Sequence, residues 1–147
     1  VNWKTIFITA SLMPLGWAMD QTGAGSWLGQ ELMVHIGHLP QWGIQASVAV
    51  LALGLSQVMQ NVGATVVMVP IAINIALATG GNPTAYILIT AMSVSNTFLI
   101  SSAHPALTMV AGPGGYRGKD YLRVGLPLTL AYLVTTIVGV DLLYKAF

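Results

Sequence analysis

Three side-chain amides and a glycine interrupt one of the most apolar parts of the chain. Gln57, Gln60, Asn61 and Gly63 lie in a stretch without any Lys, Arg, Asp or Glu from residue 35 to residue 116. A soluble domain needs charged surface over such a length, so this stretch is predicted to lie in a membrane. Amides at membrane depth are costly unless something uses them. Because an amide both donates and accepts hydrogen bonds, the Asn61 amide is a candidate ligand for a cation or an anion.

The composition indicates an integral membrane protein. The chain has 147 residues, of which 6% are charged and 55% hydrophobic, and its mean hydropathy is +0.76. This length allows about four or five helical passages of roughly 20 residues each. The net charge of +1, without a basic stripe, gives no sign of nucleic-acid binding. Because the chain begins with Val and shows no signal peptide, we expect a piece of a longer chain or a processed one.

Two short segments come before the amides. Residues 3–19 form an apolar segment just long enough to cross a membrane. Residues 24–37 place apolar side chains at spacings of three and four, which predicts an amphipathic helix along the membrane interface. Trp42 follows as an expected interface anchor.

The amides are predicted to lie at the tip of a helical hairpin. The apolar runs at residues 43–59 and 64–79 would each be about 24 Å long as helices, slightly short of the hydrocarbon thickness. Between them, residues 60–63 are expected to interrupt the helix, and residues 80–83 form a turn. Two short helices that meet at a polar tip indicate a re-entrant hairpin at residues 43–79.

A second interrupted helix is predicted after the hairpin. Residues 84–111 would extend roughly 42 Å as one straight helix, which is more than a membrane needs. Pro105 removes a backbone donor and disfavours helical geometry at the residue before it. We therefore expect a discontinuous transmembrane helix with its break near residues 101–105.

Basic residues predict the orientation. A final helix is expected at residues 120–145, with Asp120 as its N-cap. Four of the five basic residues fall on one side of the membrane in this arrangement: Lys4, Arg117, Lys119 and Arg123. The positive-inside rule makes that side cytoplasmic. The loop at residues 112–123 is therefore predicted to be cytoplasmic, and the hairpin tip is entered from outside.

Two interrupted helices together suit ion transport. The N-terminal end of a half-helix offers N–H donors to an anion, and the C-terminal end of the other half offers carbonyls to sodium. The expected substrate ligands are Asn61, Val62, Gly63, His104 and Pro105. The expected cation ligands are Met59, Gln60, Asn61, Ser101, Ser102 and Ala103. Sodium would be held by Asn61 and by backbone carbonyls near Met59 and Ser101, and no other cofactor is expected.

Simpler roles remain open for several of these side chains. The amides could only bridge helices, and Ser93, Ser95 and Thr97 could bond back to carbonyls of their own helix. His104 could satisfy a buried carbonyl. A hydrolase built on Ser102 and His104 is disfavoured, because no acid orients the histidine and no nucleophile elbow is present. The chain is therefore not expected to be an enzyme.

The residues of both predicted breaks resemble those of the divalent anion/sodium symporters. Residues 60–72 (QNVGATVVMVPIA) look like the second hairpin tip of that family. Residues 101–105 (SSAHP), 112–116 (GPGGY) and 120–128 (DYLRVGLPL) look like its second broken helix and the following loop.

The resemblance also aligns the family's binding motifs with particular residues of this chain. The Ser-Asn-Thr tip falls on Gln60, Asn61 and Val62, of which only the asparagine is kept, and the Thr-Pro of the broken helix falls on His104-Pro105. Residues 95–97 spell Ser-Asn-Thr literally, but they lie well before the expected break. They are expected to line the cavity from within the helix.

The resemblance implies an all-α integral membrane fold, the second inverted repeat of an elevator-type transporter. Residues 1–41 would supply a scaffold-side transmembrane helix and the interfacial helix, and residues 42–147 would be the transport-domain part. The implied function is sodium-coupled symport of sulfate or a di- or tricarboxylate, by a homodimer. Its partners would be the lipid bilayer, the missing N-terminal repeat and a small anionic substrate, in a plasma membrane or bacterial inner membrane. The alternatives are an oxyanion efflux permease or channel-like relative, and a non-transporting membrane subunit.

Overall fold

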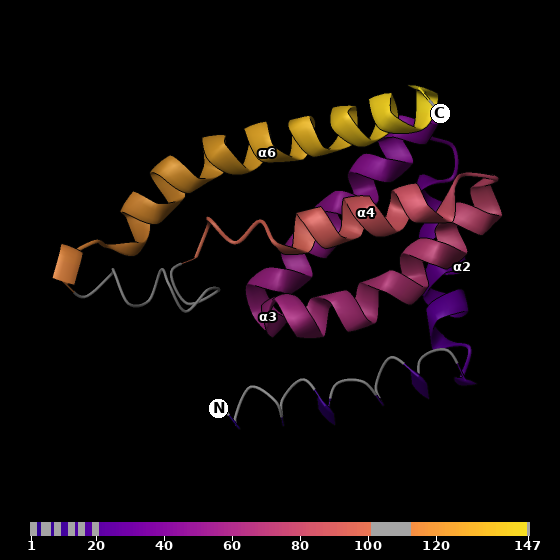
Figure 1. Ribbon diagram of the computed structural model, residues 1–147, viewed down its shortest axis with the longest axis horizontal. Helices are drawn as coiled ribbons and strands as arrows, with labels where there is room; N and C mark the ends of the chain where they lie inside the picture. Colours follow the sequence, from indigo (N-terminus) through magenta and orange to yellow (C-terminus); the bar gives the residue numbers. More distant parts are fainter. Residues whose placement is uncertain are drawn as a thin grey trace.

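The part of the chain that the computed structural model describes is all-helical. It comprises residues 21–100 and 113–146 and seven separate residues near the start of the chain. These seven are helical: residues 3, 7, 10, 11, 14, 17 and 18. The main helices are α2 (Ala24–Ile36), α3 (Gln41–Thr79), α4 (Pro83–Val94) and α6 (Gly118–Ala146) (Figure 1). The prediction of an all-α fold is therefore confirmed.

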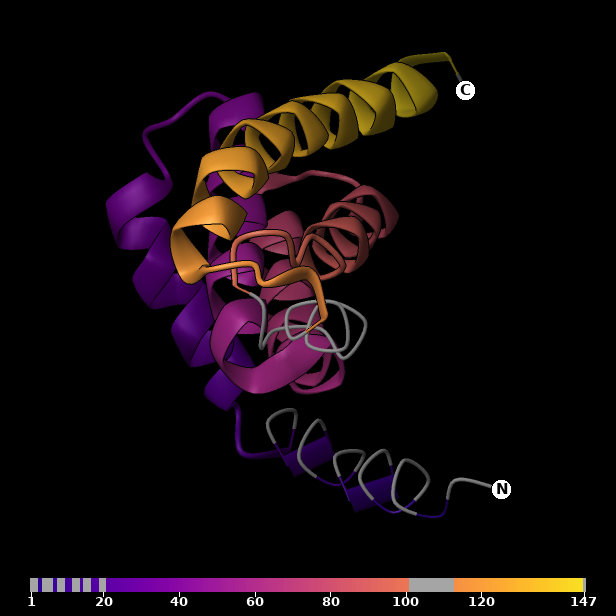
Figure 2. The ribbon, with the colours of Figure 1, turned by 90° about the vertical axis from the view of Figure 1, so that its left-hand side faces the viewer.

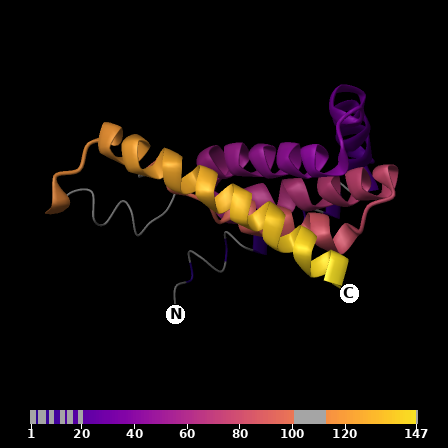
Figure 3. The same ribbon diagram turned by 90° about the horizontal axis from the view of Figure 1, so that it is seen from above.

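The longest helix, α3, folds back on itself. Its 39 residues would extend about 58 Å if they were straight. Instead the chain reverses direction near the middle of α3, and its two halves lie side by side (Figures 1 and 3). Ile44 and Val48 from the first half share a buried cluster with Ile75 and Ala76 from the second half. The reversal falls in the region of the amides.

The predicted interruption at residues 60–63 is wrong, because these residues are helical. The Thr65 hydroxyl donates a hydrogen bond to the Asn61 carbonyl oxygen at 2.7 Å, a contact between successive turns of one helix. None of the four residues is a proline, and Gly63 costs only about 1 kcal/mol in a helix. Nothing in this stretch therefore prevents helical hydrogen bonding.

The turn between α3 and α4 follows the prediction. Gly80 adopts a left-handed conformation, with φ of 67°, which a side chain would disfavour. The Asn82 side chain accepts a hydrogen bond from the Thr84 backbone N–H at 2.9 Å, and Pro83 is the first helical residue. This asparagine cap followed by proline directs α4 back along α3, and their interface holds the main core.

The helix expected at residues 24–37 is present as α2, but its apolar face contacts protein. A Cβ on Gly25 would lie 3.0 Å from the Pro70 Cβ, and one on Gly29 would lie 3.1 Å from the Asn74 Cβ. These two glycines let α2 approach the second half of α3 closely, along one side of the molecule (Figure 2). Other apolar residues of α2 pack against the same core, namely Leu28, Leu32, Met33 and Ile36.

The last helix, α6, runs antiparallel to α4 (Figures 1 and 3). Ala85 and Ile89, near the start of α4, share a buried cluster with Leu133 and Val140 of α6. Helix α6 begins two residues before the expected Asp120 cap. The Asp120 carboxylate instead accepts a hydrogen bond from the Arg117 backbone N–H at 2.8 Å, which corrects the predicted N-cap.

Two helices in the described residues are long and apolar enough to cross a membrane. They are residues Asn61–Thr79, with mean hydropathy 2.0, and Gly118–Tyr144, with mean hydropathy 1.8. Helix α4 is apolar but shorter. It ends at Val94, so the helix stops earlier than predicted, and the predicted break near residues 101–105 falls where the structure is not described. Residues 101–112 lie outside the described residues.

Candidate functional site

The break after α4 starts on the Ser-Asn-Thr tripeptide. The Asn96 backbone N–H donates to the Ser93 carbonyl oxygen at 3.1 Å, a tighter turn than the α-helix, and residues 96–100 are not helical. The Ser95 hydroxyl donates to the Ala91 carbonyl oxygen at 3.0 Å. Side chains of this kind compete with the helix for backbone hydrogen bonds, which favours an end to the helix here.

Asn96 joins the break to α6. Its side chain is fully buried. The Nδ2 group donates to the Thr129 carbonyl oxygen at 3.3 Å, and the Thr129 hydroxyl donates to Asn96 Oδ1 at 3.2 Å. Because both ends of the amide are engaged by one residue, its orientation is fixed.

The same residue joins the break to α3. Gln57 Nε2 donates to the Asn96 carbonyl oxygen at 3.1 Å. Gln57 lies one turn before Asn61 on helical backbone, so the two amides share a face of α3. The hydrogen bond therefore brings Gln57 of α3 to the break after α4. We call the polar junction these hydrogen-bonded residues together with the polar residues within about one turn of them along the chain: Gln57, Asn61, Ser93, Asn96, Thr97 and Thr129.

The polar junction is rich in unpaired oxygen atoms. Within the described residues, Gln57 Oε1, Asn61 Oδ1 and Ser93 Oγ are buried and have no hydrogen-bond partner. A buried acceptor without a partner costs about 1–3 kcal/mol. Two of the three are amide oxygens, which can only accept, so a bound cation would satisfy them. The Gln57 oxygen is free because the nitrogen of the same amide is turned toward Asn96.

The structure describes the first set of predicted site residues without testing their roles, which remain predictions. Met59 and Gln60 lie in helical backbone, Asn61 is half-buried, Gly63 is buried and Val62 is 43% exposed. The second set lies outside the described residues: Ser101, Ser102, Ala103, His104 and Pro105.

Four residues of the polar junction were not among the ligands predicted from the sequence: Gln57, Ser93, Asn96 and Thr129. The literal Ser-Asn-Thr at residues 95–97 was a usable signal for the break. Thr129 gave none, because its pairing with Asn96 exists only once α4 and α6 pack.

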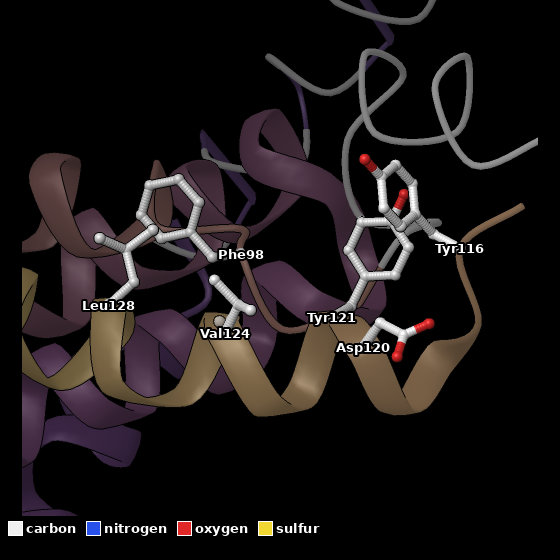
Figure 4. A pocket seen from close by; sticks show the side chains of 7 residues that line it. Phe98, Tyr116, Asp120, Tyr121, Val124 and Leu128 are labelled. Carbon is white, nitrogen blue, oxygen red and sulfur yellow. The ribbon is translucent and has the colours of Figure 1, made fainter. Parts of the chain in front are cut away.

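A separate cleft lies beside the start of α6 (Figure 4). It has a volume of about 430 Å³, and its described lining residues are Phe98, Tyr116, Asp120, Tyr121, Val124, Gly125 and Leu128. These walls are mostly apolar, the only charged side chain among them is the Asp120 carboxylate, and the Tyr116 and Tyr121 rings meet edge to face at 6.0 Å. A carboxylate in an apolar cleft repels an anion, so this cleft is a poor candidate for the binding site of an anionic substrate.

Comparison with known proteins identifies the family. Residues 1–94 match a family described as citrate transporter. The chain belongs to this family. It is 35% identical over 144 residues to an uncharacterized transporter of Synechocystis sp., covering 98% of this chain and 24% of that protein.

Two further relatives have more informative names. The chain is 25% identical to the sodium-dependent high-affinity dicarboxylate transporter 3 of Caenorhabditis elegans, over 92% of this chain and 24% of that protein. It is 22% identical to solute carrier family 13 member 1 of Homo sapiens, over 94% of this chain and 23% of that protein. The resemblance to sodium-coupled anion transporters is thus confirmed, and these relatives are transporters, not enzymes.

The chain spans about a quarter of the length of these relatives. That share is smaller than the half implied by the resemblance. The relatives are integral membrane proteins, which agrees with the two candidate spans of this chain.

Proposed function

We propose that the chain is part of a secondary transporter that carries a divalent anion, a di- or tricarboxylate or sulfate, together with sodium. The observation that supports this most is the set of unpaired oxygens at the polar junction: Gln57 Oε1, Asn61 Oδ1 and Ser93 Oγ. Oxygen atoms beside a broken helix are typical ligands of a coupling sodium ion. The names of the family and of the worm relative agree with a carboxylate substrate and with sodium.

In this proposal the cation and the anion bind together. No Lys or Arg lies between residues 35 and 116, so the positive charge next to the anion would come from the bound sodium. Helix N-termini and the side-chain amide of Asn61 would add hydrogen-bond donors. His104, Pro105 and residues 101–103 remain predicted ligands.

The transport movement that we propose is an elevator movement in a homodimer. Residues 42–147 would move with the substrate, and residues 1–41 would belong to the static scaffold. On this division α2 and the second half of α3 belong to different parts, and they meet where Gly25 and Gly29 contact Pro70 and Asn74. Small residues allow two helices to approach closely.

Replacing Asn61 by alanine in the full-length protein is expected to lower sodium-driven uptake of labelled citrate, succinate or sulfate at least about tenfold. The change removes an unpaired buried oxygen and a donor from the junction, and a tenfold change corresponds to about 1.4 kcal/mol. Gln30→Ala is the control for the loss of an amide, because Gln30 is exposed on α2.

The outcomes separate the alternatives. Normal sodium-driven uptake by Asn61→Ala would contradict the role of the junction. Uptake by the unchanged protein that ignores the sodium gradient would contradict sodium coupling and favour the channel-like permease.

The proposed orientation predicts opposite accessibility of two exposed positions. In a cysteine-free background, Asn82→Cys is expected to react with an impermeant thiol reagent from outside, and Lys119→Cys only from the cytoplasm. Both residues are exposed, at the α3–α4 turn and at the start of α6. The measurement is labelling of intact cells against inverted vesicles. Labelling of both cysteines from one side would overturn the proposed topology.

A further inference from the structure

The broken segment after α4 is held from two sides by one residue. The Asn96 side chain exchanges two hydrogen bonds with Thr129 of α6, and its backbone carbonyl accepts from Gln57 of α3. Asn96 is fully buried and Thr129 is 4% exposed. Hydrogen bonds shielded in this way are not weakened by water, so they can fix a backbone position.

The same contacts determine which way the Gln57 amide points. Its nitrogen also lies 3.3 Å from the Ser56 hydroxyl and 3.5 Å from the Leu53 carbonyl oxygen, so the donor side faces three acceptors. The Asn96 carbonyl is the nearest of the three and is the one that lies far away in the sequence. The oxygen is left on the opposite side of the amide, buried and without a partner.

We propose that Thr129, Asn96 and Gln57 form a positioning relay that runs from α6 through the break to α3. The relay fixes residues 95–97 and presents the Gln57 oxygen to the polar junction, and it thereby sets the affinity of the junction for the coupling cation. Thr129 does not touch the cation; it acts through Asn96. This inference rests on the proposed sodium coupling.

The approach of α6 to the break supports the relay. Gly125, one helical turn before Thr129, has the Phe98 and Leu99 backbone against its Cα, and a Cβ there would lie 2.9 Å from the Phe98 carbonyl carbon. The broken segment is therefore packed on the same face of α6 that carries Thr129. A change in the Thr129 hydrogen bond is expected to reach the backbone of residues 95–97 directly.

The test compares Thr129→Val, Thr129→Ser and Thr135→Val in the full-length protein. Valine keeps the shape of threonine and removes the donor to Asn96, and serine keeps the donor. Thr135 is the matched control on the same helix, because its hydroxyl donates to its own Ala131 carbonyl oxygen at 2.8 Å. Two measurements are made: the sodium dependence of uptake, which gives the half-saturating sodium concentration and the maximal rate, and amide hydrogen exchange in residues 95–97.

For Thr129→Val we expect the half-saturating sodium concentration to rise about fivefold. This is the change in affinity that corresponds to the loss of one buried hydrogen bond. The maximal rate should change less than about twofold, and exchange in residues 95–97 should be faster. Thr129→Ser and Thr135→Val should resemble the unchanged protein in both measurements.

Other results overturn the relay. If Thr129→Val speeds hydrogen exchange in residues 95–97 but leaves the sodium dependence unchanged, Thr129 has only a structural role. If hydrogen exchange is unchanged, Thr129 does not position these residues. A fall in maximal rate alone would also contradict it. If the unchanged protein shows no sodium dependence, the proposed function fails, and with it the effect of the relay on the cation. A relay that fails while the unchanged protein keeps its sodium dependence leaves the proposed function standing.

Discussion

Replacing Gly125 by valine is expected to destabilise the protein by about 3 kcal/mol, at the upper end of the cost of overpacking, and to abolish uptake. A Cβ at this position would overlap the Phe98 carbonyl oxygen and would lie 3.4 Å from the Leu99 Cα. These are backbone atoms, so no side-chain rotation can relieve the overlap. Helix α6 would have to move away from the broken segment, and the Asn96–Thr129 hydrogen bonds would be lost.

Gly139→Val is the matched control for this prediction. Gly139 lies on the same helix, and a Cβ there would have no heavy atom within 4 Å among the contacts described for it. Since valine has a higher helix propensity than glycine, the control should be neutral or slightly stabilising. The measurements are thermal unfolding in detergent and labelled-anion uptake. Equal stability of the two variants would contradict the close approach of α6 to the break.

The hairpin turn could be predicted because its signal is local. Gly80 tolerates the left-handed conformation, Asn82 favours a helix cap and Pro83 fixes its own φ, and the structure uses all three properties. The interruption at residues 60–63 was wrong for the opposite reason. Polar side chains raise the cost of burial but do not forbid helical hydrogen bonds, so residues 60–63 can be helical.

Two local signals compete to end the helix that begins at Pro83: Pro105, and the polar residues Ser95 and Asn96. Pro105 was taken to set the break, since proline disfavours helix at the residue before it. The helix in fact ends at Val94, where Ser95 and Asn96 can bond to backbone and to a neighbouring helix.

Helix α2 illustrates a second limit of prediction from sequence. Its apolar periodicity was correct, but periodicity cannot say whether that face meets lipid or α3.

Asn96→Asp is expected to cost about 3 kcal/mol of stability, the range found for an aspartate at the centre of a membrane helix. The two side chains have nearly the same shape, so packing is preserved. The Nδ2 donor to the Thr129 carbonyl would be replaced by a carboxylate oxygen, and two acceptors would face each other. The new charge would also be fully buried, since Asn96 is 0% exposed and no Lys or Arg lies between residues 35 and 116.

The same substitution at Asn82 should be harmless. Asn82 is exposed and caps α4 by accepting a hydrogen bond from the Thr84 backbone N–H. Aspartate is an equally good cap, and its charge favours the N-terminus of a helix. Thermal unfolding of the two purified variants, beside the unchanged protein, measures the difference. Equal stability of the Asn96 and Asn82 variants would mean that water or a cation already reaches Asn96, and the buried bridge between the broken segment and α6 would have to be abandoned.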